Sequence, residues 1–391
     1  MRDDTAAPGS LEALRERNRT LVLAALRRGG GVSRAELARR TGLSRSTISS
    51  VVADLVAAGI AAEAVASAPE GVGRPGVPVT LNAAAGAAVG VAVAPTSARV
   101  VLADLGHTVL AEEEIALPEP WTVAGLVDGV AAAVARAGVP AGRLIGAGVA
   151  IPAWVDRITG AIGESSTIPA LAGSDLGTAL AERLDVPVHL ENDANACAVA
   201  EVAWGAGAGA SDVVYLKLSR GIGAGLILDD RLYGGAAGTA GEIGHTTRGG
   251  DGDLCRCGNR GCLETTAGTE AIARRAGRPD VAAVLAGAEA GDVACRRALR
   301  DAGAEIGLAV AAVCNILNPR RIVIGGELAA AWPFLAASFA AALDRAAIHA
   351  AVASADVVVG RLGARAEALG ALALVLRDGD RFTVEMIGRT A

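Results

Sequence analysis

The sequence predicts a chain in two parts, a small winged-helix segment over residues 1–82 and a larger α/β domain over residues 83–391. Three observations support this division. The N-terminal segment contains three amphipathic helical stretches, strand-like and helical stretches alternate in the remainder, and a tight group of one histidine and three cysteines interrupts that alternation. The composition is 52% hydrophobic and 20% charged, which is typical of a globular protein and excludes a disordered chain.

The N-terminal segment begins with a predicted helix over residues 11–28, which three consecutive glycines end. Ser33 precedes a second predicted helix over residues 34–40 and has Glu36 three positions later, the register of a capping box. Thr41 and Gly42 form a turn, and Ser44 caps a third helix that runs to about residue 58. The first helix has apolar residues at helical spacing, namely Leu14, Leu21, Val22, Ala25 and Leu26.

The third predicted helix has an apolar face and a polar face. Its apolar stripe is Ile48, Val51, Val52 and Leu55, and the opposite face is polar and mostly small. A short helix, a glycine turn and a helix with a polar N-terminal face are typical of a helix-turn-helix, whose second helix reads bases in the major groove. We therefore expect contacts with double-stranded DNA from Arg34, Ser44, Arg45, Ser46, Thr47, Ser49 and Ser50.

A wing is predicted between residues 60 and 81, where two short strand-like runs enclose a turn-rich stretch over residues 69–76. Arg74 lies in this stretch between a glycine and a proline, and is a candidate for the minor groove, whose narrow A·T-rich form attracts arginine. The alternative is that this tripeptide is a plain loop. Residues 1–82 carry eleven arginines and eight acidic residues, a net charge of +3 in a chain of net charge −6. A basic head on an acidic body is typical of a modular nucleic-acid binder. The order of three helices and a wing favours DNA binding over the other interpretation, a helical bundle used for dimerisation.

The larger part alternates strands and helices, which predicts an α/β architecture. The predicted strands are Val89–Val93, Val100–Asp104, Ile145–Ala150, Val186–Leu190, Val213–Leu218, Gly225–Leu228, Ile322–Ile324 and Val357–Val359. The predicted helices lie near residues 122–137, 174–184, 193–204, 269–275, 293–317 and 363–377. No stretch has the length and apolarity of a membrane span, and no secretory leader is recognisable, so we expect no membrane association and a cytoplasmic location.

Two loops in this part place polar or glycine residues at strand ends. Asn192 and Asp193 follow a predicted strand and open a helix, at the edge where α/β sheets bind ligands. An aspartate there can accept a proton from a hydroxyl, or both residues can simply cap the helix. The second loop, Ser219–Gly225, is a glycine-rich hairpin that permits close approach to an anion, with a plain turn as the alternative.

The strongest chemical signal is a Cys₃His set over residues 245–262. His245, Cys255, Cys257 and Cys262 provide four ligands of the kind that a tetrahedral Zn²⁺ prefers. Because the four side chains leave no position for an activated water, we expect a structural zinc. The alternative, unrelated reduced thiols, does not explain so tight a group. The remaining cysteines stand in apolar helical segments and are expected in the core: Cys197, Cys295 and Cys314.

These segments together resemble the ROK family of repressors and sugar kinases, and within it the transcription regulators with an N-terminal winged helix-turn-helix. The resemblance covers nearly the whole chain through the matching segments 18–19, 31–38, 41–49, 191–196, 221–225, 241–245, 255–264 and 318–326. It implies an actin-like, ribonuclease H-like fold of two lobes with a sugar pocket between them. By motif position, it also implies a sugar-binding set of Asn192, Asp193, Glu242, His245 and Glu264, in which His245 binds zinc through one ring nitrogen and a sugar hydroxyl through the other.

The sequence departs from the family's kinases at the residues that handle phosphate. Ala92 stands where the kinases have an aspartate, and Ala94 and Pro95 replace two glycines. Arg220 stands where threonine is usual, while the Gly325-Gly326 segment of the adenosine motif remains. Lost charge neutralisation and lost backbone donors impair phosphoryl transfer, so we expect no enzyme activity. A further departure is Ser165-Ser166-Thr167, in a region where the kinases commonly carry an asparagine.

We therefore expect a transcription regulator of sugar metabolism, a repressor whose DNA affinity changes when a sugar or sugar derivative binds. A homodimer or homotetramer is expected, because one winged helix reads too few base pairs for high specificity. One alternative is a bifunctional DNA-binding sugar kinase. Another is a zinc-dependent assembly protein whose larger domain contacts a second protein.

Overall fold

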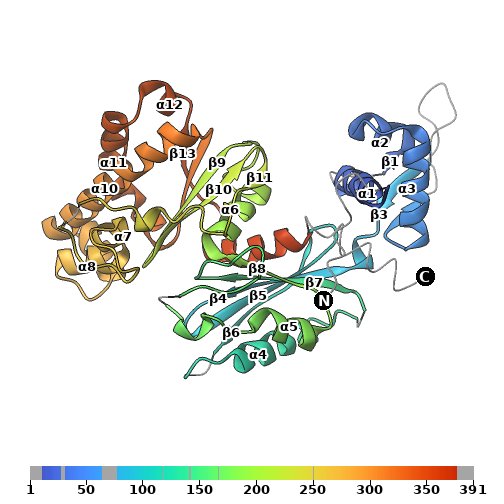
Figure 1. Cartoon of the computed structure of the whole chain (residues 1–391), viewed down its shortest axis with the longest axis horizontal. Coiled ribbons are helices and arrows are strands. Elements are labelled where there is room, and N and C mark those ends of the chain that lie inside the picture. The colour runs from blue at the N-terminus through green and yellow to red at the C-terminus, as the bar shows by residue number, and fades with distance from the viewer. Residues whose placement is uncertain are drawn as a thin grey trace.

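The described part of the N-terminal segment folds into three helices and a three-stranded sheet. The computed structural model describes residues 11–27, 31–63, 77–117, 119–140, 142–165, 167–249 and 251–376. The helices are α1 (Leu11–Arg27), α2 (Arg34–Thr41) and α3 (Arg45–Ala57), and the sheet has the order β1-β3-β2, with β1 (Val32–Ser33), β2 (Ala61–Glu63) and β3 (Pro78–Leu81). Figure 1 shows this unit at one end of the molecule, beside the two larger parts. Arg74 lies outside the described residues.

The predicted caps form these helices. The Ser33 hydroxyl accepts a hydrogen bond from the Glu36 backbone N–H, and the Ser44 hydroxyl accepts one from Thr47. Gly42 ends α2 at a φ of 71°, a backbone conformation that favours glycine. The Glu36 side chain binds Arg39 and Arg40 of its own helix. The predicted apolar stripe of α3 is buried, so the opposite face of this helix is left to solvent.

The first lobe of the larger part is a five-stranded sheet of order β6-β5-β4-β7-β8. Its strands are β4 (Ala87–Val93), β5 (Ser97–Asp104), β6 (Val109–Ala116), β7 (Leu144–Ile151) and β8 (Val188–Asn192). β4, β5 and β6 form an antiparallel meander, whereas β4, β7 and β8 are parallel. α4 (Val123–Arg136) and α5 (Leu176–Leu184) pack on one face, and two short 3-10 turns, η1 (Ala83–Ala85) and η2 (Pro169–Leu171), precede β4 and α5.

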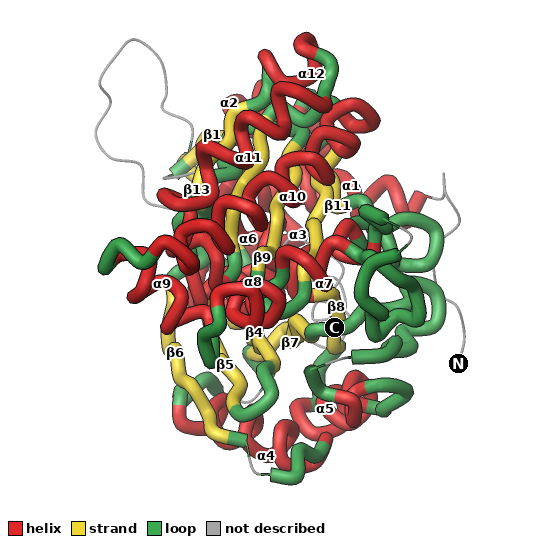
Figure 2. Tube along the Cα trace, turned by 90° about the vertical axis from the view of Figure 1, so that its left-hand side faces the viewer, coloured by secondary structure: helices red, strands yellow, loops and turns green. Residues whose placement is uncertain are grey.

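The second lobe is a five-stranded sheet of order β11-β10-β9-β12-β13. Its strands are β9 (Val213–Leu218), β10 (Ile222–Leu228), β11 (Arg231–Leu232), β12 (Arg321–Gly325) and β13 (Asp356–Val359). Figure 2 shows α10 and α11 lying across this sheet. The helices of this lobe are α7 (Leu263–Ala267), α8 (Thr269–Ala276), α9 (Val281–Glu289), α10 (Val293–Leu317), α11 (Trp332–Ala346) and α12 (His349–Ala353), with 3-10 turns η3 (Ile243–His245), η4 (Glu327–Ala331) and η5 (Gly363–Arg365).

Two helices lie between the sheets, α6 (Asp193–Trp204) and the helix over residues 366–376. Glycines let them approach the sheets and each other, because a Cβ at these positions would overlap backbone. At Gly90 and Gly148 of the first sheet it would meet carbonyl oxygens of helix 366–376, at 2.1 and 2.0 Å. At Gly225 of β10 it would meet the Ala194 carbonyl of α6, and at Gly370 it would lie 1.8 Å from the Ala196 carbonyl. The two helices therefore join the lobes through close backbone packing.

Several elements differ from the sequence-based expectations. β8 ends at Asn192, two residues later than predicted, so that α6 follows without a connecting loop. β6, α9 and α11 were not predicted. The uncharged stretch over residues 328–343 contributes to η4 and α11, which pack with α10 in the second lobe. Among the described residues, no helix is long and apolar enough to span a bilayer.

The winged helix touches the first lobe near His107, in the turn between β5 and β6. The His107 ring meets the Trp204 ring of α6 edge to face, with centroids 5.4 Å apart. Leu23 of α1 and Leu105 belong to one buried apolar cluster. Burial, followed by the positive charge of Arg27, holds the pKa of His107 below its usual value, while the Asp104 carboxylate acts in the opposite direction. The structure therefore favours a neutral His107 at this contact.

We predict that His107 makes the protein less stable at mildly acidic pH. Because the folded pKa lies below the ordinary value of 6.5, the unfolded chain binds more protons as the pH falls through 6.5, and the free energy of unfolding decreases. His107→Asn should flatten this part of the profile, since asparagine tolerates the positive φ of 68° found here. Urea unfolding from pH 7.5 down to about pH 5 measures the difference between the two proteins. Parallel profiles would contradict the prediction.

Candidate functional site

A cavity of about 880 Å³ lies between the lobes, at the carboxyl ends of strands from both sheets. One wall comes from the first lobe and includes Ala92, Pro95, Trp154 and Thr167. The other wall comes from the β9–β10 turn and from the segments around residues 238–245 and 256–264. Seven acidic residues and the chain's single lysine line this cavity, among them Asp193, Lys217, Glu242, Glu264 and Glu367. The site is therefore a polar interlobe pocket.

The junction of β8 and α6 gives Asn192 and Asp193 different roles. The Asn192 carboxamide oxygen accepts hydrogen bonds from the Ala194 and Asn195 backbone N–H groups, so Asn192 caps α6. Its Nδ2 donates to the Ala153 carbonyl of the first lobe, at 3.2 Å. Asp193 takes no part in the cap and lines the cavity, where its Oδ2 accepts from Lys217. Of the two residues, only Asp193 has its side chain available to the pocket without giving up a helix cap.

Lys217 is the important residue of this pocket that the motif analysis missed. It lies on β9, and its ammonium is 2.6 Å from Asp193 Oδ2 and 2.5 Å from Glu367 Oε1. Burial disfavours the charged ammonium, but the carboxylates of Asp193 and Glu367 outweigh this effect and hold the pKa of Lys217 above its usual value. The signal in the sequence was a lone lysine within an apolar strand, in a chain whose other basic residues are arginines.

The predicted metal ligands come together beside the pocket. One ligand atom from each of His245, Cys255, Cys257 and Cys262 lies within 4.8 Å of the others. The Cys255 sulfur is 3.5 Å from His245 Nδ1, and the Cys257 and Cys262 sulfurs are 3.6 Å apart. A tetrahedral ion with metal–sulfur bonds of about 2.3 Å requires separations of roughly this size. The four residues can therefore hold a metal ion.

The knuckle depends on two glycines with positive φ. Gly258 has a φ of 89° and Gly261 a φ of 68°, backbone conformations that favour glycine and allow a tight turn. At Gly261 an added Cβ would also lie 1.9 Å from the Gly249 carbonyl. Cys262 then follows as the N-cap residue of α7, and this helix places Glu264 at the cavity.

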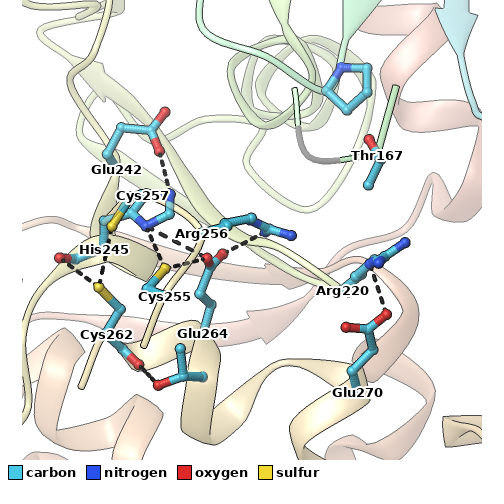
Figure 3. Close-up of polar contacts among 12 residues, drawn as sticks. Thr167, Arg220, Glu242, His245, Cys255, Arg256, Cys257, Cys262, Glu264 and Glu270 are labelled. Carbon is cyan, nitrogen blue, oxygen red and sulfur yellow. Dashed lines mark hydrogen bonds and ion pairs between the residues drawn. The ribbon is translucent and has the colours of Figure 1, made fainter. Parts of the chain in front are cut away.

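Two glutamates flank the histidine on opposite sides of its ring (Figure 3). Glu264 Oε1 is 3.0 Å from the Cys255 sulfur and 3.6 Å from His245 Nδ1, while Glu264 Oε2 accepts from Arg256 at 2.7 Å. Glu242 Oε2 lies 3.8 Å from the other ring nitrogen, Nε2. Burial raises the pKa of Glu242 above its usual value. Nδ1 therefore faces the sulfurs, and Nε2 faces the cavity side.

The two turns expected to correspond to the phosphate loops of a kinase make contacts within the chain. The backbone N–H of Ala94 donates to the Ser97 carbonyl, which closes the β4–β5 turn. Arg220, in the β9–β10 turn, forms an exposed ion pair with Glu270 at 2.9 Å. On the opposite wall, the Ser165 hydroxyl donates to the Pro152 carbonyl and accepts from Ile168. Ser165 is thus occupied by the loop itself, whereas Thr167 lines the cavity across from Arg256 (Figure 3).

The second candidate surface is the polar face of α3. Ser44, Arg45, Ser46, Ser49 and Ser50 are exposed and Thr47 is half-buried. The Ser44 hydroxyl lies 2.8 Å from those of both Ser46 and Thr47, so the first turn presents a compact group of hydroxyls. Arg34 stands apart from this group, at the start of α2, and forms an ion pair with Glu63 of β2.

Known protein families and relatives match nearly the whole chain. The ROK family model matches residues 88–378, and the MarR family model matches residues 16–68. The xylose repressor of Caldicellulosiruptor bescii is 27% identical over 394 residues, which cover 95% of this chain and 98% of the repressor.

Two solved structures support the same arrangement. A ROK family transcriptional regulator, described as a homologue of the Escherichia coli MLC protein, has a TM-score of 0.84 at 23% identity and covers 96% of this chain and 99% of its own. A ROK family glucokinase from Streptomyces griseus, in complex with glucose and AMPPNP, has a TM-score of 0.64 at 27% identity and covers 74% of this chain and 99% of its own. The predicted fold, an actin-like pair of lobes preceded by a winged helix, is confirmed.

Proposed function

Because the chain belongs to the ROK family, we propose that it is a DNA-binding transcription regulator, a repressor, whose affinity for its operator changes when a sugar or sugar derivative binds between the lobes. One observation carries this proposal: a single chain joins an exposed helix-turn-helix face to a polar interlobe pocket. A full-length relative with the same two parts is named a xylose repressor. We assign DNA reading to residues 1–82 and ligand binding to residues 83–391.

The chemistry of the pocket supports a polyhydroxylated ligand. Carboxylates accept hydrogen bonds from hydroxyl groups, and Asp193, Glu242 and Glu264 reach the same cavity. A volume of about 880 Å³ lies within the range of small-molecule sites. Since a buried polar group that a ligand leaves without a partner is costly, such a site rejects ligands that lack matching hydroxyls. We include Asn192 and His245 in the sugar set, Asn192 chiefly because its Nδ2 holds the first-lobe segment at Ala153.

We assign a structural zinc ion to His245, Cys255, Cys257 and Cys262. A Cys₃His set suits Zn²⁺, and with four protein ligands the ion's role is to organise the loop. The chain's own residues then do the positioning: Nδ1 of His245 faces the sulfurs, which leaves Nε2 for a ligand hydroxyl on the cavity side. α7 begins directly after Cys262, so the same cluster positions Glu264.

The pocket can communicate with the winged helix through α6. This helix begins at Asp193 in the pocket and ends at Trp204, whose ring packs on His107 beside Arg27 of α1. A rigid helix transmits a small displacement from one end to the other, provided that the ligand favours one lobe arrangement. A homodimer or homotetramer would place two winged helices on paired half-sites of double-stranded DNA.

A thermal-shift titration against hexoses, pentoses, amino sugars and their phosphates tests the ligand. A sugar at about 100 times its Kd should stabilise the protein by about 2.7 kcal/mol. Glu242→Gln and Glu264→Ala should abolish the shift, whereas Glu182→Ala, an exposed position on α5, should keep it. If no sugar in the panel raises the Tm of the wild type, the result favours the alternative that this domain contacts a second protein.

The second candidate function, a DNA-binding sugar kinase, is favoured by the likeness to a glucokinase solved with glucose and AMPPNP. We propose no useful kinase activity, because the end of β4 and the turn after it offer Ala92, Ala94 and Pro95 where metal and phosphate partners are needed. The assay is ATP-dependent phosphorylation of the sugar that gives the thermal shift. A rate that disappears in Asp193→Asn would replace our proposal with the bifunctional one.

A further inference from the structure

The lone lysine of this chain joins carboxylates from both sides of the interlobe pocket. Lys217 extends from β9 of the second sheet. Glu367 belongs to helix 366–376, which packs on the first sheet at Gly90 and Gly148. Asp193 opens α6, the helix between the sheets. A single ammonium therefore meets one negative charge from each of two crossing helices.

The three groups are close and largely withdrawn from water. Nζ of Lys217 is 2.6 Å from Asp193 Oδ2 and 2.5 Å from Glu367 Oε1, and the side chains are 16%, 13% and 27% exposed, respectively. Two carboxylates this near to one another repel, and the repulsion grows as water is excluded. The ammonium neutralises one of the two charges and bonds to both groups. Without the Lys217 ammonium, the two carboxylates would repel each other across the packed helices α6 and 366–376.

Among the described residues, no other basic side chain forms an ion pair with Asp193 or Glu367. Arg256 is bound by Glu264 and Arg220 by Glu270, so the two arginines of the β9–β10 side are already paired. Lysine also differs from arginine in shape, because its charge is a compact point on a flexible stem that fits between two carboxylate oxygens much as a small cation would. The chain uses arginine at its other basic positions and lysine at this one alone.

We propose that Lys217 is a positioning residue that acts as a built-in cation of the pocket, joining Asp193 to Glu367 and so holding the two lobes in one arrangement without a bound metal ion or nucleotide. One part of this proposal, the contact between Asp193 and a sugar, rests on the proposed function. Asp193 keeps Oδ1 for a ligand hydroxyl while Oδ2 stays on Lys217, so a ligand meets a carboxylate that is already oriented.

The test replaces Lys217 with methionine, which has a similar length and no charge, in the full-length protein without sugar or DNA. Removing one partner of a largely buried ion pair should lower Tm by roughly 5 °C. The two carboxylates left facing each other should now recruit Mg²⁺, an oxygen-seeking cation. Millimolar MgCl₂ should therefore raise the Tm of Lys217→Met and leave that of the wild type unchanged, with NaCl at equal ionic strength as the control.

Two further variants make the result specific. Lys217→Met combined with Glu367→Gln should lose the Mg²⁺ response, because one carboxylate is gone. Glu367→Gln alone keeps Lys217 on Asp193 and removes the negative charge from the link to helix 366–376, so its radius of gyration in solution scattering should exceed that of the wild type. This second variant also decides the matter if Lys217→Met does not fold.

An unchanged Tm and no Mg²⁺ response in Lys217→Met, or a wild-type radius of gyration in Glu367→Gln, would overturn the proposal. Because these measurements involve neither sugar nor operator, they stand or fall separately from the proposed repressor function. A protein that binds no sugar can still have Lys217 joining Asp193 to Glu367, and a sugar-binding protein can still lack this link.

Discussion

Cys262→Ser is expected to abolish metal binding and, with it, the response to sugar. Cys262 is fully buried. It ends the knuckle, forms an isolated β-bridge with Thr247 and directly precedes α7. A weaker ligand at this point leaves three side chains, too few for the tetrahedral geometry of a structural zinc. Since α7 carries Glu264, the loss should also misplace a proposed sugar contact.

Metal analysis and thermal unfolding measure this effect. The wild type should carry about one zinc per chain and Cys262→Ser far less, and a chelator should lower the Tm of the wild type alone. Cys314→Ser is the matched control, because Cys314 is equally buried but lies in α10, outside the cluster. Undamaged wild-type protein with far less than one zinc per chain would contradict the assignment.

Ser49→Glu is expected to remove operator binding while leaving the fold intact. Ser49 is exposed on α3, one turn after Arg45, so the substitution buries nothing. A carboxylate on this face would meet DNA phosphates or base acceptors without a partner, and we expect a loss of affinity of at least about 100-fold. Arg45→Ala should have a smaller effect, roughly 10-fold, and should weaken the salt dependence if its partner is a phosphate.

Fluorescence anisotropy with an operator fragment, selected from random DNA by the wild-type protein, gives both affinities. Ala57→Glu adds the same charge at an exposed position in the last turn of the same helix and should bind nearly as well as the wild type. Equal affinity for Ser49→Glu and the wild type would exclude this face as the reading surface. A uniform loss in all three variants would instead point to a general charge effect.

Local signals in the sequence were sufficient for most elements and for the metal cluster. Ser33, Gly42 and Ser44 bound the helices as predicted, because a cap acts through hydrogen bonds within one turn. The cysteines and Gly258 lie within a few residues of each other, so their spacing alone limits how they can be arranged. The DNA-contact, sugar-contact and zinc assignments are proposals, and the sequence alone indicates their residues.

Elements that depend on the surrounding core were harder to predict. α11 has an uncharged stretch with no clear amphipathic boundary, and its helical state becomes evident only where it packs against α10. The end of β8 moved to Asn192 because parallel pairing with β7 continues to that residue. Such pairing depends on a neighbouring strand that lies about 40 residues away in the chain, and local propensity does not encode it.

By itself, the sequence determined the winged helix with its polar α3 face, the alternation of strands and helices, the Cys₃His set and the family resemblance, because each is written in residues that are near one another or in a recognisable motif. Only the tertiary structure decided that Asn192 caps α6 while Asp193 faces Lys217, and that Glu367, 150 positions further along the chain, completes the same ion cluster. It also placed Trp204 against His107. Periodicity and spacing report on local geometry, whereas contacts between lobes follow from how two whole sheets pack around α6 and helix 366–376.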